Sequence, residues 1–423
     1  MVTESLSTNP PPEDGESPSL DGRRTLNEES VEAGAHPADD FSLVLGGPVY
    51  QLLLRTRLVR PPLDRVGPRI AVITGMAWLP LVPLAVLGGR FAGGVQVPFV
   101  HDFEVHARLL FALPLMILAE LIVHARMRAI VAQFVERQII TGNVRPAFNA
   151  VVSSAINLRN SVVTEVSLML LIAVAGPTVW QGMLALNSDT WYATLNSSGL
   201  NLTLSGYWYA FVSVPIFQFV LLRWYYRVFI WCRFLFQTSR LDLNLVPIHP
   251  DRCCGLGFLG NVAFAFSPLL MAHSGLVAGF IANRILYEGA TLPEYKLELV
   301  AMLAFLMLIV VGPLCVFAPK LNQARHAGLR TYGRLASDYV ISFAKKWTGC
   351  AKPEGEPFIG SADIQSLADL DNGFAVVRES RLVPVSAQVV GHVALVAALP
   401  LVPLGLTMFS LEELLRRLLA MLF

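Results

Sequence analysis

One stretch of the chain places an acid, a histidine and an arginine four residues apart: Glu120, His124 and Arg128. Four residues is close to one helical turn, so the three side chains would share one face of a helix. Ionisable groups inside a membrane are costly and usually face a bundle interior or a cavity. Because histidine changes its charge near neutral pH, Glu120 and His124 could relay protons or hold a cation. Alternatively, His124 and Arg128 already lie among lipid headgroups, and only Glu120 requires an explanation.

Three further polar side chains interrupt apolar stretches and could line the same path: Glu165, His273 and His392. Each also has a structural interpretation. Glu165 could stabilise a helix N-terminus or pair with Arg159, and a lone histidine in an apolar helix is usually a hydrogen-bonded packing residue.

A second group contains four side chains of metal-ligand type within six residues: His101, Asp102, Glu104 and His106. Histidine and carboxylate together suit zinc or another divalent transition metal. On a strand the last three would share a face, whereas on a helix Asp102 would pair with His106. The alternative is a solvated polar loop that caps a helix. The cofactor therefore stays unknown, with a divalent metal as the candidate.

A third group lies in a short turn that holds His249, Asp251, Cys253 and Cys254 and continues into a glycine-rich GxGxxG sequence, residues 255–260. That sequence signifies dinucleotide binding only after a strand, in a βαβ unit, and here it opens an apolar helix. The turn could bind a soft metal or act in gating. It could equally be a tight turn that leads back into the membrane.

Two arginines, Arg223 and Arg227, share a helical face within an aromatic stretch. Arginine beside aromatic rings is typical of an anchor at the membrane boundary, with the guanidinium on lipid phosphate. We favour that interpretation over an anion-binding site, which the shared face would also allow.

The composition identifies the elements that must position these groups. Of the 423 residues 54% are hydrophobic and only 15% are charged, whereas soluble domains carry about a quarter charged residues. Mean hydropathy is +0.55. Runs of about 20 apolar residues, the length needed to cross a bilayer, predict seven spans near residues 70–89, 108–125, 162–180, 207–230, 257–281, 299–319 and 385–408. Each contains at least one proline, so we expect an all-α polytopic bundle of proline-kinked helices.

Lysine and arginine collect in alternate loops, before the first span and after the second, fourth and sixth. By the positive-inside rule these loops are cytoplasmic. The N-terminus is then cytoplasmic too, in a multi-pass protein of the inner (plasma) membrane. The balance of 32 Lys+Arg against 31 Asp+Glu provides no basic surface for nucleic acid.

Four regions follow from this pattern. Residues 1–45 form a polar, acidic and disordered cytoplasmic tail; residues 46–319 hold spans one to six; residues 320–384 form a cytoplasmic helical insertion. Residues 385–423 hold the seventh span and a short interfacial helix over residues 411–423.

The function predicted from sequence is a transporter or channel for a small solute or ion, through a cavity lined by Glu120 and His124. One alternative is a membrane metalloprotein or redox enzyme that uses residues 101–106. Another is a membrane sensor or assembly factor that acts through residues 320–384. Common hydrolase, nucleotide-binding and haem motifs are absent from the sequence, which argues against an enzyme. The expected partners are the lipid bilayer and a small solute or ion, and a homo-oligomer is left open.

Overall fold

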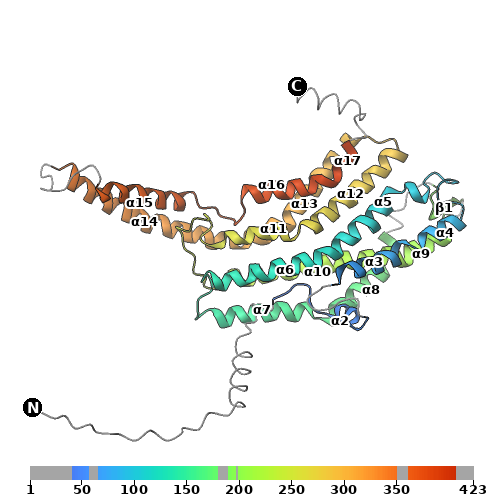
Figure 1. Cartoon of the computed structure of the whole chain (residues 1–423), viewed down its shortest axis with the longest axis horizontal. Helices are drawn as coiled ribbons and strands as arrows, with labels where there is room; N and C mark the ends of the chain where they lie inside the picture. Colours follow the sequence, from blue (N-terminus) through green and yellow to red (C-terminus); the bar gives the residue numbers. More distant parts are fainter. Residues whose placement is uncertain (1–40, 57–64, 180–188, 197–198, 350–360, 406–423) are drawn as a thin grey trace, which may run out of the picture.

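The computed structural model describes residues 41–56, 65–179, 189–196, 199–349 and 361–405. Most of the predicted N-terminal tail and the whole predicted interfacial helix, residues 411–423, lie outside these ranges. Within them the chain is almost entirely helical (Figure 1).

Six of the described helices are long and apolar enough to cross a membrane, or seven if one bent pair counts as a span. The chain therefore has the composition and helix lengths of a multi-pass integral membrane protein. The six are Val66–Leu87, Phe103–Glu136, Leu204–Ser239, Ser267–Tyr287, Leu292–Trp347 and Ala387–Gly405. The bent pair joins α7 (Arg145–Arg159) to α8 (Val162–Val179), with 41° between the two helices.

Most of these spans consist of consecutive segments of different helix type. The second contains α5 (Phe103–His106), a π-helical segment η2 (Ala107–Ala112) and α6 (Leu113–Glu136). The third contains α9 (Leu204–Trp208), the π-helical η4 (Tyr209–Ser213) and α10 (Val214–Ser239). The remaining segments are α3 (Val66–Trp78), α4 (Leu81–Leu87), α12 (Ser267–Tyr287), 3₁₀ η6 (Leu292–Tyr295), α13 (Lys296–Val311), 3₁₀ η7 (Gly312–Phe317), α14 (Ala318–Trp347), α16 (Ala387–Ala398), 3₁₀ η8 (Leu399–Leu401) and α17 (Val402–Gly405).

Prolines lie at many of these changes of helix type. Pro114 and Pro215 each occupy the second residue of the α-helix that follows a π-helical segment. Proline lacks the N–H that would bond one turn back, and a local change of helix type accommodates the lost bond. The bend between α7 and α8, by contrast, lies at Asn160–Ser161, where there is no proline. Bending of the spans at prolines remains a prediction.

The helices form two groups that lie side by side (Figure 1). One contains α3, α6, α7, α8 and α10, and the other contains α11 (Val262–Ala265), α12, α13 and α16. Contacts of α6 with α11 and α12 join the two groups. The predicted fifth span, residues 257–281, is divided differently: its first part forms the 3₁₀ segment η5 (Leu256–Asn261) and α11, and the long helix begins at Ser267.

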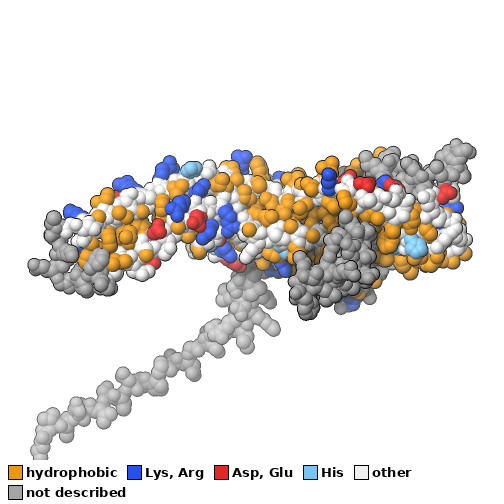
Figure 2. All heavy atoms as spheres, turned by 90° about the horizontal axis from the view of Figure 1, so that it is seen from above, with side chains coloured by type: hydrophobic (Ala, Val, Ile, Leu, Met, Phe, Trp, Pro, Cys, Tyr) orange, Lys and Arg blue, Asp and Glu red, His pale blue; other side chains and the backbone are white. Residues whose placement is uncertain are grey.

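The two ends of the molecule differ. At one end α14 (Ala318–Trp347) and α15 (Ala362–Arg378) pack on each other and extend beyond the other helices (Figure 1). The opposite end holds 3₁₀ η1 (Phe99–His101) and a two-stranded antiparallel sheet, β1 (Ala193–Asn196) with β2 (Gly199–Leu202), a small exception to the predicted all-α fold. Basic side chains gather towards the α14–α15 end and hydrophobic ones dominate farther along the same face (Figure 2). We call the α14–α15 end the inner end and the opposite end the outer end, as names for positions in the molecule alone.

The N-terminal segment that precedes the spans packs into the bundle. Phe41, Leu43 and Val44 are buried, and the Phe41 ring contacts the rings of Trp231 and Phe234. A short helix, α2 (Pro48–Arg55), follows. Residues 41–45, which the sequence assigns to the disordered tail, therefore form part of the described core.

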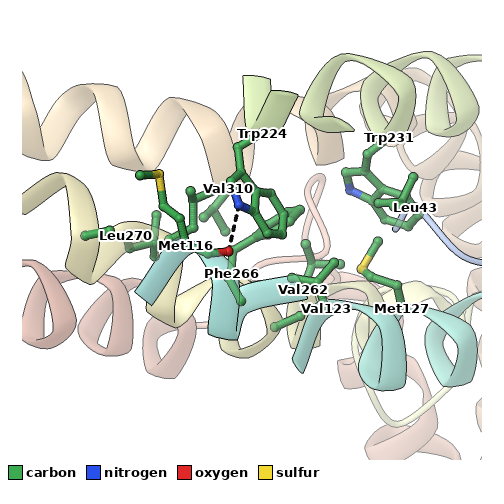
Figure 3. Packing of buried hydrophobic residues seen from close by; sticks show 14 of the residues in the cluster. Leu43, Met116, Val123, Met127, Trp224, Trp231, Val262, Phe266, Leu270 and Val310 are labelled. Atoms are coloured by element: carbon green, nitrogen blue, oxygen red, sulfur yellow. Dashed lines mark hydrogen bonds between the residues drawn. The ribbon is translucent and has the colours of Figure 1, made fainter. Parts of the chain in front are cut away.

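Large apolar side chains from many helices make up that core (Figure 3). Trp224 of α10 lies among Met116, Phe266 and Val310, and its indole N–H donates to the Met116 carbonyl oxygen at 2.9 Å. This bond satisfies the one polar atom of a fully buried ring.

Candidate functional site

A cluster of five charged side chains is buried between α3, α6, α8 and α10, and we call it the arginine–glutamate cluster. Its members are Arg69, Glu120, Glu165, Arg223 and Arg227. The position of each follows from helix geometry: Arg69 and Glu165 lie in the first turns of α3 and α8, and Arg223 and Arg227 are one turn apart on α10.

Glu120 stands at the centre of the cluster. Its Oε2 lies 2.9 Å from Nη2 of Arg69, and its Oε1 lies 2.8 Å from Nη1 of Arg227. Arg223 is more distant, with Nη1 3.8 Å from the same Oε1. The other nitrogen of Arg223, Nη2, lies 3.5 Å from Oε1 of Glu165, so Arg223 links the two carboxylates.

The cluster has more positive than negative charge, because three arginines face two glutamates. It also has unused hydrogen-bond donors: neither Nε of Arg69 nor Nη2 of Arg227 has an acceptor among the described residues, although both atoms are buried. A buried donor without an acceptor is costly. Part of the compensation for Arg227 comes from the Trp224 ring, whose centre lies 4.8 Å from the guanidinium carbon.

A cavity of about 580 Å³ opens from the cluster. Arg69, Glu120 and Arg223 form its charged end, and apolar side chains of α2, α3, α8 and α10 form most of the remaining wall. A cavity of this size, apolar with a few convergent polar groups, is typical of a small-molecule binding site.

Residues 42–49 lie beside the cluster and are tied to it by hydrogen bonds. The backbone N–H of Val49 donates to Oε2 of Glu165 at 2.8 Å, and Arg223 donates to the Gly46 carbonyl oxygen at 3.4 Å. Arg159 donates to the Ser42 carbonyl oxygen at 2.6 Å. These contacts hold the N-terminal segment in place near the charged end of the cavity.

The histidines predicted to line a transport path do not join Glu120 around this cavity. His124 contacts the hydroxyl of Ser42 at 2.8 Å. His273 lies between the hydroxyl of Tyr225 and the Leu269 carbonyl, and His392 contacts Ser267. None of the three lines the cavity. Of the predicted path residues, the structure brings only Glu120 and Glu165 together, through Arg223.

The predicted metal-binding group, residues 101–106, lies at the outer end and is engaged in protein contacts. Asp102 accepts hydrogen bonds from the Val105 amide, from Trp191 Nε1 and from Asn283 Nδ2. Both ring nitrogens of His106 are also occupied: Trp78 donates to Nδ1, and Nε2 contacts the Phe99 carbonyl. Glu104 pairs with Arg108, while the His101 carbonyl accepts from the Tyr287 hydroxyl.

Within the described ranges, no group of three or more histidine, cysteine or acidic side chains could hold a metal ion. The structure therefore gives no support to the predicted metal site at residues 101–106. The physical reason is that the segment turns into a helix at Phe103, with Asp102 as its N-cap. The side chains of Asp102, Glu104 and His106 then contact separate partners.

In the predicted ligand turn, residues 249–254, Asp251 organises the backbone. Its carboxylate accepts from the amides of Cys253, Gly255 and Gly257, at 2.8 to 3.1 Å. Burial alone raises the pKa of Asp251, but these three amides outweigh it and hold the pKa below the ordinary value. Burial raises the pKa of both the Cys253 and Cys254 thiols to about 11, so both stay protonated and unreactive at neutral pH.

The favoured sequence interpretation of Arg223 and Arg227, a headgroup anchor, is wrong. Arg227 is only 3% exposed and Arg223 is part of the same buried ion-pair group. Arg69 is the member that sequence reasoning misses. It directly precedes the first predicted span, residues 70–89, and so falls among the basic residues of the loop before that span. The available signal was its position at the start of an apolar run, directly before Ile70-Ala71-Val72.

Comparison with protein-family models, with curated proteins and with solved structures finds no match for this chain. Functional inference therefore depends on the geometry of the cavity and the arginine–glutamate cluster.

Proposed function

We propose that this protein is an integral membrane transporter that binds an anionic solute at the arginine–glutamate cluster. The observation that carries the proposal is the excess of guanidinium over carboxylate at the charged end of a cavity between membrane-spanning helices. Planar guanidinium groups present paired donors that match carboxylate and phosphate oxygens.

The same charges argue against a cation or proton path through Glu120. A cation would approach three arginines, with only Glu120 and Glu165 to offset them. Both Glu120 oxygens already pair with arginine nitrogens, so a proton or metal ion would have to compete with two guanidinium groups for this carboxylate. An anion in the cavity would instead use the guanidinium groups of Arg69 and Arg223, which line it, and Nε of Arg69 has no acceptor among the described residues.

We propose that the protein lies in the plasma membrane, with its N-terminus and the α14–α15 hairpin in the cytoplasm. The concentration of lysine and arginine at that end supports it. In this orientation Arg69 and Glu165 begin their helices on the inner side, so the arginine–glutamate cluster lies nearer the cytoplasm. An anion would then reach its binding site close to the inner surface.

Binding is tested by thermal unfolding of the purified protein in an uncharged detergent, at constant ionic strength. Two series of sodium salts are added: simple anions (acetate and phosphate) and the same head groups on alkyl chains. A ligand that binds only the folded state raises Tm with its concentration. We expect at least one series to raise Tm in the wild type and in Arg240→Gln, an exposed arginine at the end of α10. In Arg223→Gln the rise should be lost.

A rise in Tm that survives Arg223→Gln, or no rise with either series, would overturn anion binding at the cluster. Transport is tested separately in proteoliposomes with the anion that binds best. Flux in the wild type that falls in Arg223→Gln supports a carrier. Binding without protein-dependent flux would leave a binding protein and reject transport.

The α14–α15 hairpin supports a second candidate function, as a sensor or assembly factor. Leu335, Val340 and Ile341 of α14 are each about half exposed or more, although the hairpin extends beyond the other helices (Figure 1). Exposed apolar side chains on a projecting element are typical of a protein-binding surface. A triple serine variant at these positions should lose any protein that co-purifies with the wild type, and equal recovery from both would reject this candidate.

A further inference from the structure

We propose that the anion is the head group of a membrane amphiphile, whose acyl chain occupies the apolar part of the cavity and which enters sideways from the bilayer. This inference rests on the proposed anion binding and names the class of ligand: a monoanionic head, carboxylate or phosphate ester, on a long hydrocarbon chain.

The first support is the shape and chemistry of the cavity. Its wall follows α3 from Arg69 to Met76 and the third span from Arg223 back to Phe211. At 1.5 Å per residue these stretches extend about 10 and 18 Å from the charged end. Apart from Gln218, the wall along them is apolar, with Ile73, Ala210, Val214, Pro215, Phe219 and Val220 among its side chains. A water-soluble anion would gain nothing from so long an apolar extension.

The second support is the direction in which the cavity opens. Three of its lining side chains are strongly exposed: Met76 at 50%, Met169 at 49% and Phe211 at 62%. They belong to α3, α8 and η4, elements of membrane-spanning length and composition. Exposed apolar side chains on spans face lipid, so the mouth between these three elements would open towards hydrocarbon chains.

The third support is the contact between residues 41–49 and the charged end. This segment is bonded to Glu165, Arg223 and Arg159, and Phe41 and Leu43 are buried within the bundle. A soluble anion from the inner aqueous phase would have to displace these bonds. An amphiphile that slides in from the side would not.

The fourth support concerns the head group. The cluster carries one more positive than negative charge, which a single anionic charge would neutralise. Gln218 lines the same cavity, and its Oε1 is buried without a donor among the described residues. A hydroxyl next to the anionic group, as in a glycerol ester, would supply that donor.

The test compares ligands that share a head but differ in chain, with protein in nanodiscs of zwitterionic lipid. Displacement of the fluorescent fatty acid cis-parinaric acid reports binding by octanoate, laurate and oleate, beside acetate and oleyl alcohol. Each methylene moved from water into an apolar site adds about 0.8 kcal/mol, or roughly fourfold in affinity. We expect affinity to rise steeply from acetate to laurate, and oleyl alcohol to bind at least tenfold more weakly than oleate.

A matched pair of variants tests where the acyl chain of the ligand lies. Ala173→Phe adds a ring to the cavity wall, whereas Val174→Phe adds the same ring to the neighbouring side chain, which is 69% exposed and does not line the cavity. We expect Ala173→Phe to weaken oleate at least tenfold while octanoate changes little, and Val174→Phe to bind both like the wild type. Equal oleate affinity in the two variants would overturn the proposed binding of the acyl chain in this cavity.

The outcomes separate this inference from the proposed function. If acetate and phosphate displace the probe as well as oleate does, anion binding stands and the amphiphile is rejected. If oleyl alcohol binds as well as oleate, and Arg223→Gln changes neither, anion binding itself is rejected. Nanodiscs that contain phosphatidylglycerol identify the source of the amphiphile. Competition of this lipid with oleate indicates a bilayer phospholipid, and no competition indicates a free fatty acid. Either result supports an anionic head group on an acyl chain.

Discussion

Two buried polar networks both pair arginine with carboxylate, but they differ in how completely their hydrogen-bonding groups are satisfied. At the outer end Asp102 accepts three N–H groups, and Glu104 pairs with Arg108, which also bonds to Tyr209. Midway along the long helices, the arginine–glutamate cluster has more arginines than glutamates, unused donors and a cavity. Burial of charge alone therefore does not identify a functional site.

Their roles follow from this difference. A carboxylate with matched donors on three segments fixes those segments to one another, as Asp102 does for the loop before α5, the Trp191 loop and α12. A group with excess charge and open space retains capacity for a ligand. We therefore expect substitutions at the outer end to change stability alone, and those in the arginine–glutamate cluster to change ligand binding as well.

The largest effect is expected from Glu120→Gln. Removal of one partner from a buried ion pair typically costs about 3–5 kcal/mol, because the other charge stays buried, and here three arginines lose their shared carboxylate. The free energy of unfolding in detergent should fall by that order. Glu298→Gln, at an exposed site in the first turn of α13, should change little.

The response of Glu120→Gln to added anions provides a second test of the cluster. With Glu120 neutral, the excess positive charge doubles, so added anions should restore part of the lost stability. A Tm equal to that of the wild type, or a loss of stability that anions do not reduce, would contradict the ion-pair role assigned to Glu120.

At the outer end Asp102→Asn should lower the free energy of unfolding by about 1–3 kcal/mol, the usual cost of one buried donor left without a partner. The amide NH₂ of asparagine would face donors from Val105, Trp191 and Asn283, and only its one oxygen could accept from them. Affinity for the best-bound anion should be unchanged, as measured by probe displacement. A weaker affinity would mean that the two ends are coupled.

Sequence reasoning succeeds where a signal is local and fails where partners come from distant segments. Apolar runs and their lengths are enough to predict the multi-pass helical architecture, because each span must satisfy its own backbone hydrogen bonds. Glu120 could be singled out because a carboxylate is costly in such a run. Its partners Arg69 and Arg227 lie 51 residues before it and 107 residues after it, and no local pattern connects them.

The predicted metal group is the opposite case: the sequence places its residues close together, and the structure gives the side chains of Asp102, Glu104 and His106 separate partners. Asp102 finds its partners at Trp191 and Asn283, which are 89 and 181 residues away. The closeness of Asp102, Glu104 and His106 in the sequence therefore does not bring their side chains to a common site.

Gly47→Ala tests the contact between the N-terminal segment and the cluster. Gly47 has φ of 90° and ψ of 165°, a conformation nearly confined to glycine, and an added Cβ would lie 2.7 Å from Oε1 of Glu165. A residue forced into such a region costs on the order of 1–3 kcal/mol. Gly67→Ala, in the first turn of α3 with open space around it, should be neutral or stabilising by about 0.5–1 kcal/mol.

If the segment restricts access to the cluster from water, Gly47→Ala should also increase the affinity of acetate relative to oleate, because the loosened segment admits soluble anions. An unchanged ratio in a destabilised variant would indicate that residues 41–49 stabilise the bundle without limiting access.

The smallest effect is expected at Asp251, where a carboxylate is satisfied as completely as Asp102 but by backbone amides of its own turn. Its pKa is lower in the folded than in the unfolded protein. The stabilisation is therefore fully present above the unfolded pKa of about 3.9 and disappears as pH falls through the folded value. Asp251→Asn should be less stable than the wild type at pH 6, and the difference should shrink as the pH falls through 4 towards 3. Asp242→Asn, an exposed site, should show no such convergence. A stability difference that is constant from pH 6 to 3 would show that the charge of Asp251 is not what holds the turn.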